Sequence, residues 1–171
     1  MAALCRFERR LYSVDLQSKD MTISLNNRQR SIRLDVAWLR RFAEIALGEC
    51  LAHSGDERFA LKALPEVEVA IVSDRVIARV HLDFMGIAGA TDVITFEHGE
   101  IVMSAQTAAI YAQRFGHSVE RELALYVIHG LLHLNGFDDR TARDHTRMHR
   151  VQERVMQACL CQLPPLNSPP P

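Results

Sequence analysis

The stretch His129-Gly-Leu-Leu-His133-Leu-Asn-Gly136-Phe-Asp138-Asp139 carries most of a metal site within eleven consecutive residues. Residues four apart on an α-helix lie one turn above each other, so His129 and His133 would project their imidazoles from one face into one small volume. Two ring nitrogens can then bind one divalent cation. We therefore expect a metal site on a central helix and on the turn that follows it.

The residues before this stretch indicate a helix that begins near residue 118. Apolar residues recur at helical spacing through residues 120–134, at Leu123, Val127, Leu131 and Leu134. Ser118 is a suitable N-cap, and acidic Glu120 and Glu122 favour the first turn because a helix N-terminus carries partial positive charge. Asn135-Gly136 supplies the left-handed residue that commonly ends a helix and reverses the chain.

Acidic residues after the turn complete the expected site. Asp138 and Asp139 follow the chain reversal, so a carboxylate can return toward the two histidines, and we expect Asp139 to be this third ligand. An N,N,O set leaves the fourth position to water, which is typical of catalytic rather than structural zinc. We predict one zinc ion per chain, although histidine and carboxylate also bind nickel, iron or manganese.

Other interpretations of these histidines stay open. Two histidines at this spacing also occur by chance on half-buried helices. His145 and His149 form a second pair four residues apart, but no turn with an acidic return follows them, so we expect them to be exposed to solvent. Gly130 stands where the helix of zinc peptidases has the Glu that deprotonates water. An ordinary zinc protease is therefore disfavoured.

Two motifs carry a resemblance to a known family. Residues 129–138 read His-Gly-x-Leu-His-Leu-x-Gly-Phe-Asp, and upstream Thr91-Asp92-Val93-Ile94-Thr95-Phe96 precedes Gly99-Glu100-Ile101. In sequence, order and separation these motifs resemble the YbeY family, and the resemblance covers roughly residues 21–160. It implies a bacterial, single-domain, metal-dependent endoribonuclease linked to ribosomal RNA maturation.

The chain departs from the family pattern at two positions. The family usually has His as the third ligand where this chain has Asp139. Because oxygen binds zinc at a similar distance, we expect binding to survive with altered affinity. The family also usually carries an Arg shortly before the Thr-Asp-Val strand, where this chain has Met85. A thioether cannot stabilise negative charge developing on phosphate, so either another cation does so or the activity is weakened. No side chain is identified as the catalytic base.

Composition and length fit one cytoplasmic domain. The chain has 171 residues, 48% of them hydrophobic, and a net charge of −1. We expect residues 1–20 to be a disordered extension, residues 21–161 the metal-dependent domain, and residues 162–171 a proline-rich disordered tail. No stretch approaches a membrane span, and early charges argue against a secretory signal. The cysteines lack metal-cluster spacing and are interpreted as reduced thiols: Cys5, Cys50, Cys159 and Cys161.

Periodicity predicts an α+β domain with a small mixed β-sheet packed with helices. Strands are expected over 22–25, 66–72, 91–96 and 100–103, and the second of these alternates as a half-buried strand does. Helices are expected over residues 35–50 with Asp35 as cap, from Ser73-Asp74 to about 84, over 104–115, over the metal helix, and over about 140–161.

Arginines recur at three- and four-residue steps along the expected last helix, within an arc of about 80°. They are Arg140, Arg143, Arg147, Arg150 and Arg154. We predict that the first four bind RNA by tracking its phosphates past the metal. The alternative is a solvated face balanced by Asp144 and Glu153. A second basic cluster comprises Arg28, Arg30, Arg33, Arg40 and Arg41. The low net charge makes any nucleic-acid surface local rather than global.

With the resemblance, these features predict a metal-dependent single-strand endoribonuclease acting in ribosomal RNA maturation and ribosome quality control. Its expected partners are RNA, in particular small-subunit ribosomal RNA, and ribosomal proteins. The cation would polarise a phosphoryl oxygen or activate water for attack at phosphorus. Two alternatives stay open. One is a non-catalytic ribosome-assembly factor whose metal only braces the helix and turn, which Met85 favours, and the other is a metal-dependent hydrolase of another small substrate or a peptide.

Overall fold

The computed structural model of the chain describes residues 21–53, 55 and 61–166. The elements follow in the order β1 (Thr22–Asn27), α1 (Val36–Leu51), the 3-10 helix η3 (Leu61–Ala63), β2 (Glu66–Val72), α2 (Asp74–Met85), β3 (Val93–Thr95), β4 (Glu100–Ser104), α3 (Ala105–Phe115), α4 (Val119–Leu134) and α5 (Ala142–Gln162). All predicted strands and helices are present, with ends that differ from the predicted ones by at most two residues.

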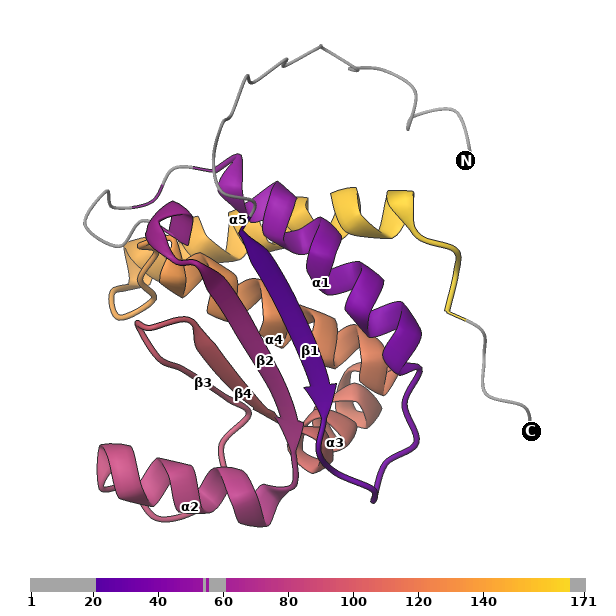
Figure 1. The fold of residues 1–171 in the computed structure, drawn as a ribbon, viewed down its shortest axis with the longest axis vertical. Coiled ribbons are helices and arrows are strands. Elements are labelled where there is room, and N and C mark those ends of the chain that lie inside the picture. The colour runs from indigo at the N-terminus through magenta and orange to yellow at the C-terminus, as the bar shows by residue number, and fades with distance from the viewer. Residues whose placement is uncertain (1–20, 54, 56–60, 167–171) are drawn as a thin grey trace.

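The strands form one mixed sheet in the order β1-β2-β4-β3. β1 and β4 both pair with β2 in parallel, whereas β3 pairs with β4 antiparallel. Figure 1 shows the sheet in front of the helical layer that α1, α4 and α5 form. The predicted α+β architecture with a small mixed sheet is confirmed.

The two faces of the sheet pack against different helices because side chains alternate along a strand. Val67, Val69 and Ile71 of β2 belong to the main core with α1, α4 and α5, whereas Ala70 and Val72 belong to a smaller cluster that includes Ile77 of α2. The expected half-buried alternation of β2 is therefore correct only for its first half. From residue 69 onward every residue of β2 is buried, since α2 covers the second face.

α4 is the central helix, as predicted, and its ends are capped as expected. The Ser118 hydroxyl accepts a hydrogen bond from the Arg121 N–H at 3.2 Å, and Gly136 after the helix has a φ of 82°. Asp35 caps α1 by accepting from the Trp38 N–H at 2.9 Å. The expected cap of α2 is different, because the Ser73 side chain makes no capping hydrogen bond. The hydroxyls of Ser104 and Thr107 donate to the Asp74 carboxylate, which ties α2 to α3.

The chain remains anchored beyond the last helix. Gln162 belongs to α5, and the indole N–H of Trp38 donates to the Pro164 carbonyl at 3.2 Å. Leu163 and Leu166 pack against the main core. Ordered contacts therefore continue to residue 166 of the predicted tail, whereas residues 167–171 and the predicted extension 1–20 lie outside the described residues. The thiols of Cys50 and Cys159 are free, and Cys5 lies outside the described part.

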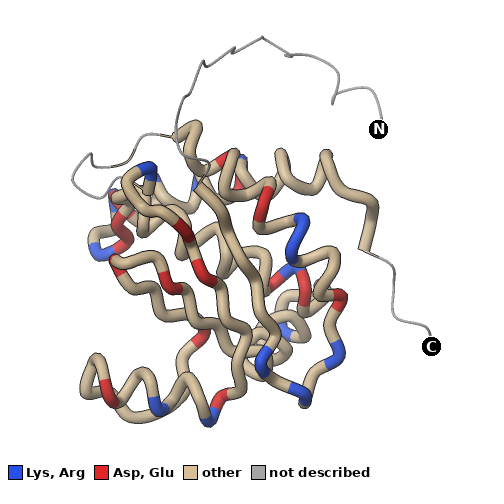
Figure 2. The backbone as a smooth tube through the Cα atoms, in the orientation of Figure 1, with Lys and Arg blue, Asp and Glu red and all other residues tan. Residues whose placement is uncertain are grey.

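Basic residues gather at one end of the sheet. Arg28, Arg30 and Arg33 lie in the connection from β1 to α1, where Figure 2 shows blue segments at the lower right. This connection follows the carboxyl ends of β1 and β2, since the Arg28 N–H donates to the Ile71 carbonyl at 2.8 Å. None of the helices in the described ranges is long and apolar enough to cross a membrane.

Candidate metal centre

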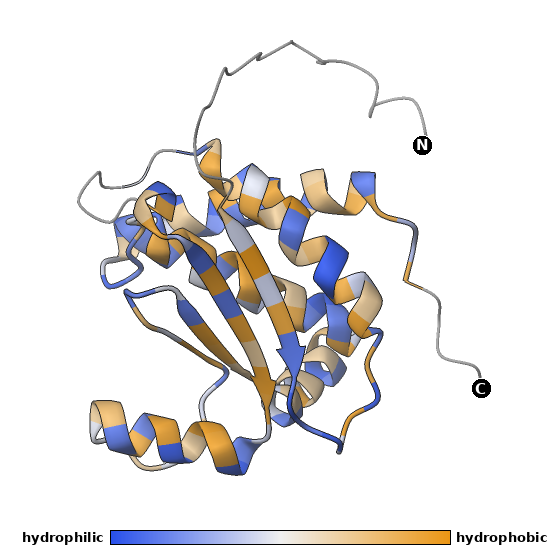
Figure 3. Cartoon of the chain, in the orientation of Figure 1, coloured by the Kyte–Doolittle hydropathy of each residue, from blue (hydrophilic) through white to orange (hydrophobic). Residues whose placement is uncertain are grey.

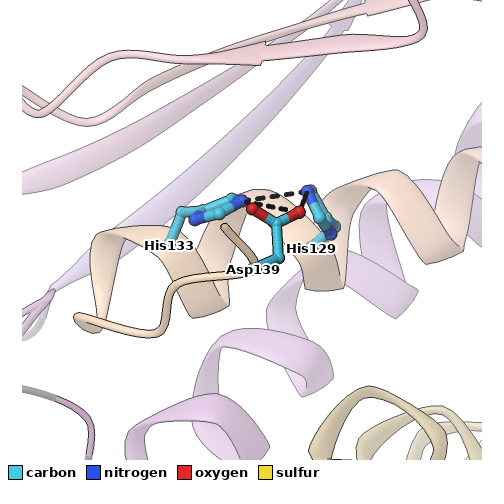
Figure 4. Close-up of side chains that lie close together, drawn as sticks. All are labelled: His129, His133 and Asp139. Atoms are coloured by element: carbon cyan, nitrogen blue, oxygen red, sulfur yellow. Dashed lines mark hydrogen bonds and ion pairs between the residues drawn. The ribbon is translucent and has the colours of Figure 1, made fainter. Parts of the chain in front are cut away.

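Three predicted side chains converge at the end of α4. Nε2 of His129 lies 2.9 Å from Nε2 of His133, and Oδ2 of Asp139 lies 3.8 Å from the first nitrogen and 3.9 Å from the second. Figure 4 shows both imidazoles on one face of α4 and Asp139 on the loop that folds back beneath them. The chain reversal at Gly136 brings this carboxylate back to a helix that the chain has already left.

The donor set suits a divalent transition metal. Bond lengths of about 2.0–2.2 Å for zinc to nitrogen or carboxylate oxygen place two tetrahedral ligand atoms about 3.3–3.4 Å apart. The three observed separations, 2.9, 3.8 and 3.9 Å, bracket this value. All three side chains are partly exposed at the surface. The arrangement could therefore hold an ion with one position open toward solvent.

The turn after α4 fixes the orientation of His133. Nδ1 of His133 lies 3.0 Å from the backbone carbonyl oxygen of Phe137. A carbonyl only accepts hydrogen bonds, so Nδ1 carries the proton and Nε2 keeps a lone pair for a metal. The Phe137 N–H in turn donates to the Leu132 carbonyl at 3.0 Å. The same turn thus orients one imidazole and returns Asp139 to the site.

His129 is held in its neutral form. Burial lowers the pKa of its imidazole, and the neighbouring His133 lowers it further. Asp139, Asp92 and a hydrogen bond with the Gln152 side chain act in the opposite direction, but the net pKa stays below the ordinary value. Neutral imidazole is the form that binds metals. Sequence reasoning missed the contact with Gln152 of α5 and the electrostatic influence of Asp92 on this site.

Asp138 has a different role from Asp139. Its carboxylate accepts from the backbone N–H groups of Asp139 and Arg140 and pairs with the Arg140 guanidinium at 2.5 Å. The Arg140 hydrogen bond is the largest cause that lowers the pKa of Asp138 to about 2. Asp138 therefore organises the turn, and Asp139 is the carboxylate that faces the histidines.

The site lies in an open cleft of about 910 Å³. Met85 of α2, Thr95 of β3 and residues 136–140 line this cleft together with both histidines. Gly130 faces the sheet instead, because a Cβ there would lie 2.7 Å from Cδ1 of Ile101 and 3.0 Å from Oγ1 of Thr95. A Glu at residue 130, as in zinc peptidases, would therefore not fit in this packing.

The rival histidine pair does not form a comparable site. His145 and His149 are both exposed on α5, as expected, with ring centroids 6.3 Å apart. Among the described residues, only His129, His133 and Asp139 form a group of three potential ligands close enough to share an ion. Two other histidines lie beside carboxylates. Nε2 of His117 lies 3.1 Å from the Glu122 carboxylate, and Nε2 of His98 lies 3.6 Å from the Glu100 carboxylate.

The predicted arginine stripe divides into two parts. Arg140 was expected on the last helix. It instead precedes α5 and pairs with Asp138, so it belongs to the turn. Arg143, Arg147, Arg150 and Arg154 are exposed on α5. The Arg147 guanidinium lies 5.0 Å from the ring centroid of Phe137, which also lines the cleft. One end of the stripe therefore reaches the cleft wall.

Comparisons with known proteins identify the family and the fold. Residues 24–159 match the family model described as Endoribonuclease YbeY. The Endoribonuclease YbeY of Symbiobacterium thermophilum is 33% identical over 156 residues, covering 80% of this chain and 96% of the relative. That of Caldicellulosiruptor saccharolyticus is 28% identical, with the same two coverages of 80% and 96%. The solution structure of a Thermotoga maritima protein, 24% identical, has a TM-score of 0.58 and covers 88% of this chain and 97% of that chain, a likeness of fold.

Proposed function

Because this chain belongs to the YbeY endoribonuclease family, we propose that it is a metal-dependent single-strand endoribonuclease acting in ribosomal RNA maturation and ribosome quality control. One observation carries the proposal. His129, His133 and Asp139 meet within 4.8 Å of one another in an open cleft, with the histidine nitrogens oriented for a cation. A nuclease needs such access because the phosphodiester must reach the ion.

These three side chains are the proposed ligands of one zinc ion per chain. The set of two imidazoles and one carboxylate is common to catalytic zinc sites that keep an open position. When bound there, a divalent cation supplies Lewis-acid polarisation of a phosphoryl oxygen and lowers the pKa of water. The imidazole of His129 is ready for this role, since its pKa is already below the ordinary value.

Residues of the chain hold the site in shape. The Phe137 carbonyl fixes the tautomer of His133, and Asp138 with Arg140 orders the loop that presents Asp139. Such outer contacts orient metal ligands and commonly raise metal affinity 10- to 100-fold. We propose no side chain of the cleft as the base, and catalysis then depends mainly on the cation and on the placement of the RNA.

We place the RNA path along the cleft and the start of α5. Arg143, Arg147 and Arg150 are exposed there, and Arg147 stacks on a ring of the cleft wall. Arg140 also lines the cleft but is neutralised by Asp138. Arg28, Arg30 and Arg33 of the second basic cluster lie beyond the carboxyl ends of β1 and β2, whereas the cleft is lined by Ala63 and Leu64 before β2. These three arginines are therefore too remote to serve the same path.

Small-subunit ribosomal RNA is the proposed substrate, with ribosomal proteins as partners in the cytoplasm. The test is cleavage of purified structured ribosomal RNA by zinc-loaded protein, with zinc-depleted protein as the matched control and mapping of the new RNA ends. Discrete cuts in single-stranded segments, made only by the zinc-loaded protein, are the expected result. Cutting that is equal in both samples would contradict metal dependence.

A second candidate function is that of a non-catalytic, RNA-binding ribosome-assembly factor. Met85 favours it, because this residue lines the cleft where a cation would otherwise stabilise charge on the phosphate. In that case the zinc-loaded protein binds ribosomal RNA and leaves it intact. Cleavage of the same RNA by the zinc-loaded wild type distinguishes the two candidates, and a gain of cleavage in Met85→Arg would show that the missing cation limits the rate.

A further inference from the structure

An exposed aromatic group lies on the rim of the cleft. Phe84, near the end of α2, is 71% exposed, and its ring packs edge-to-face on Phe96 with centroids 5.1 Å apart. Phe96, just after β3, stacks in turn on His98 with centroids 5.5 Å apart and planes inclined by 28°. We call Phe84, Phe96 and His98 the aromatic ledge. In Figure 3 the end of α2 at the lower left carries hydrophobic segments in orange beside hydrophilic ones in blue.

The aromatic ledge adjoins the candidate metal centre. Met85, the neighbour of Phe84, lines the same cleft as His129 and His133. Thr95 and Glu97, on either side of Phe96, line it as well. The rings of the ledge do not themselves line the cleft, and Phe96 packs on the sheet face that α2 covers. Each ledge residue nevertheless adjoins, in sequence, a residue that lines the cleft. An RNA chain that leaves the metal centre past Met85 and Glu97 would therefore meet the ledge.

Charge argues against phosphate binding on this rim. Glu97 lines the cleft here, and the His98 ring lies 3.6 Å from the Glu100 carboxylate. Arg140, at the opposite wall, is the one cation that lines the cleft among the described residues, and it is paired with Asp138. A nucleic acid on this side must therefore be held by its bases rather than by its phosphates. Stacking suits this need, because every base presents a π-face and stacking tolerates any sequence.

We propose that the aromatic ledge stacks bases of single-stranded RNA whose adjoining phosphodiester lies at His129, His133 and Asp139. This inference rests on the proposed nuclease function and assigns the ledge as its positioning surface. It also explains why large apolar side chains are exposed there, since a base covers them only when RNA is bound. In this arrangement the ledge binds the bases of the RNA, and the arginines of α5 bind its phosphates.

The chain supplies a matched control for the ledge. Tyr111, Phe115 and His117 form a second stacked series with similar chemistry, and Phe115 is 62% exposed. None of these three residues lines the cleft, and none adjoins in sequence a residue that does, whereas every ledge residue has such a neighbour. Phe84→Ala and Phe115→Ala thus remove equally exposed rings from sites that differ in their position relative to the metal centre. His98→Ala is a second ledge variant, since this side chain is 69% exposed.

The experiment measures the affinity of zinc-loaded protein for a nuclease-resistant single-stranded 2′-O-methyl oligoribonucleotide. Phe84→Ala should bind roughly 5- to 100-fold more weakly, the range expected for loss of one stacked base. Phe115→Ala should bind like the wild type. The slope of log affinity against log salt should not change in Phe84→Ala, because no phosphate contact is lost. An abasic nucleotide at the stacked position should weaken binding to the wild type but not to Phe84→Ala.

The outcomes separate this inference from the function on which it rests. If the wild type binds RNA and both phenylalanine variants bind equally well, the ledge does not hold RNA, and its exposed rings are free to serve a protein partner. If the wild type binds no single-stranded RNA, the proposed function and the ledge fall together. If Phe84→Ala loses affinity and flattens the salt dependence, a phosphate contact rather than stacking is responsible, and the inference is wrong.

Discussion

Gly130 of α4 lies so close to Ile101 of β4 that a Cβ atom at residue 130 would come within 2.7 Å of the Ile101 Cδ1. Gly130 directly follows His129, so the helix face next to the candidate metal centre is the face that packs on the sheet. This contact fixes how α4 is rotated and hence which way the two imidazoles point. The close packing of the core and the geometry of the site are therefore coupled through one residue.

Substitution of Gly130 tests this packing. Gly130→Ala should lower the free energy of unfolding by about 1 kcal/mol, because overpacking of about 1–3 kcal/mol exceeds the roughly 1 kcal/mol gained by replacing a helical glycine. Gly48→Ala in α1 is the control, since nothing lies within 4 Å of a Cβ there, and it should instead raise stability. Denaturant unfolding measures both. Stabilisation in both variants would contradict this prediction, because it would show that the Ile101 side chain moves aside at little cost.

Asp139 is expected to be the third metal ligand. Asp139→His should retain zinc, because imidazole replaces one ligand by another, whereas Asp139→Ala should weaken binding by at least about tenfold. Asp138→Ala should have the smaller effect, since the Asp138 carboxylate is engaged with Arg140 and the loop backbone. Competition titration with a zinc chelator gives the three affinities. The reverse order for the two alanine variants would make Asp138 the ligand.

Gln152 is expected to position His129 from the neighbouring helix. Its side chain hydrogen-bonds the imidazole, so Gln152→Leu should lower zinc affinity by about tenfold while leaving one ion per chain at saturation. Gln157→Leu is the matched control, because Gln157 is exposed on the same helix. Equal zinc affinities in the two variants would show that the Gln152 contact does not contribute to zinc binding.

The arginines of α5 are expected to bind phosphates. Charge reversal at Arg143, Arg147 and Arg150 should weaken binding to many RNA sequences about equally and flatten its salt dependence, by nearly one unit of slope per lost phosphate contact and somewhat less on single strands. The fold should survive, because these side chains are exposed. Helix content by circular dichroism is the control. An unchanged slope in a folded variant would leave the stripe as a solvated face.

Local patterns were sufficient to predict the helix and turn of the site. Ser118 as N-cap, the spacing of His129 and His133, and the glycine that reverses the chain all act within a few residues. Their consequences in space follow from helix geometry alone. Helix geometry does not distinguish Asp138 from Asp139; Asp139 was the expected ligand, and it is the carboxylate that faces the histidines.

Contacts between distant elements could not be predicted in this way. The second buried face of β2 depends on α2, and the Gln152 contact depends on how α5 packs beside α4. Arg140 fits the arginine period, but α5 begins only at Ala142, and Arg140 pairs with Asp138 in the preceding turn. Periodicity reports which face of one element is apolar, and it carries no information about which neighbour covers that face.

The most direct test measures zinc content and RNA cleavage in the same protein samples. His129→Ala and His133→Ala should each lose both, because the two remaining ligands cannot hold zinc tightly. The double variant His145→Ala with His149→Ala should keep one zinc per chain and the wild-type cleavage rate, since that exposed pair lies outside the site. Cleavage that persists in zinc-free His129→Ala or His133→Ala would contradict a metal-dependent nuclease centred on these residues.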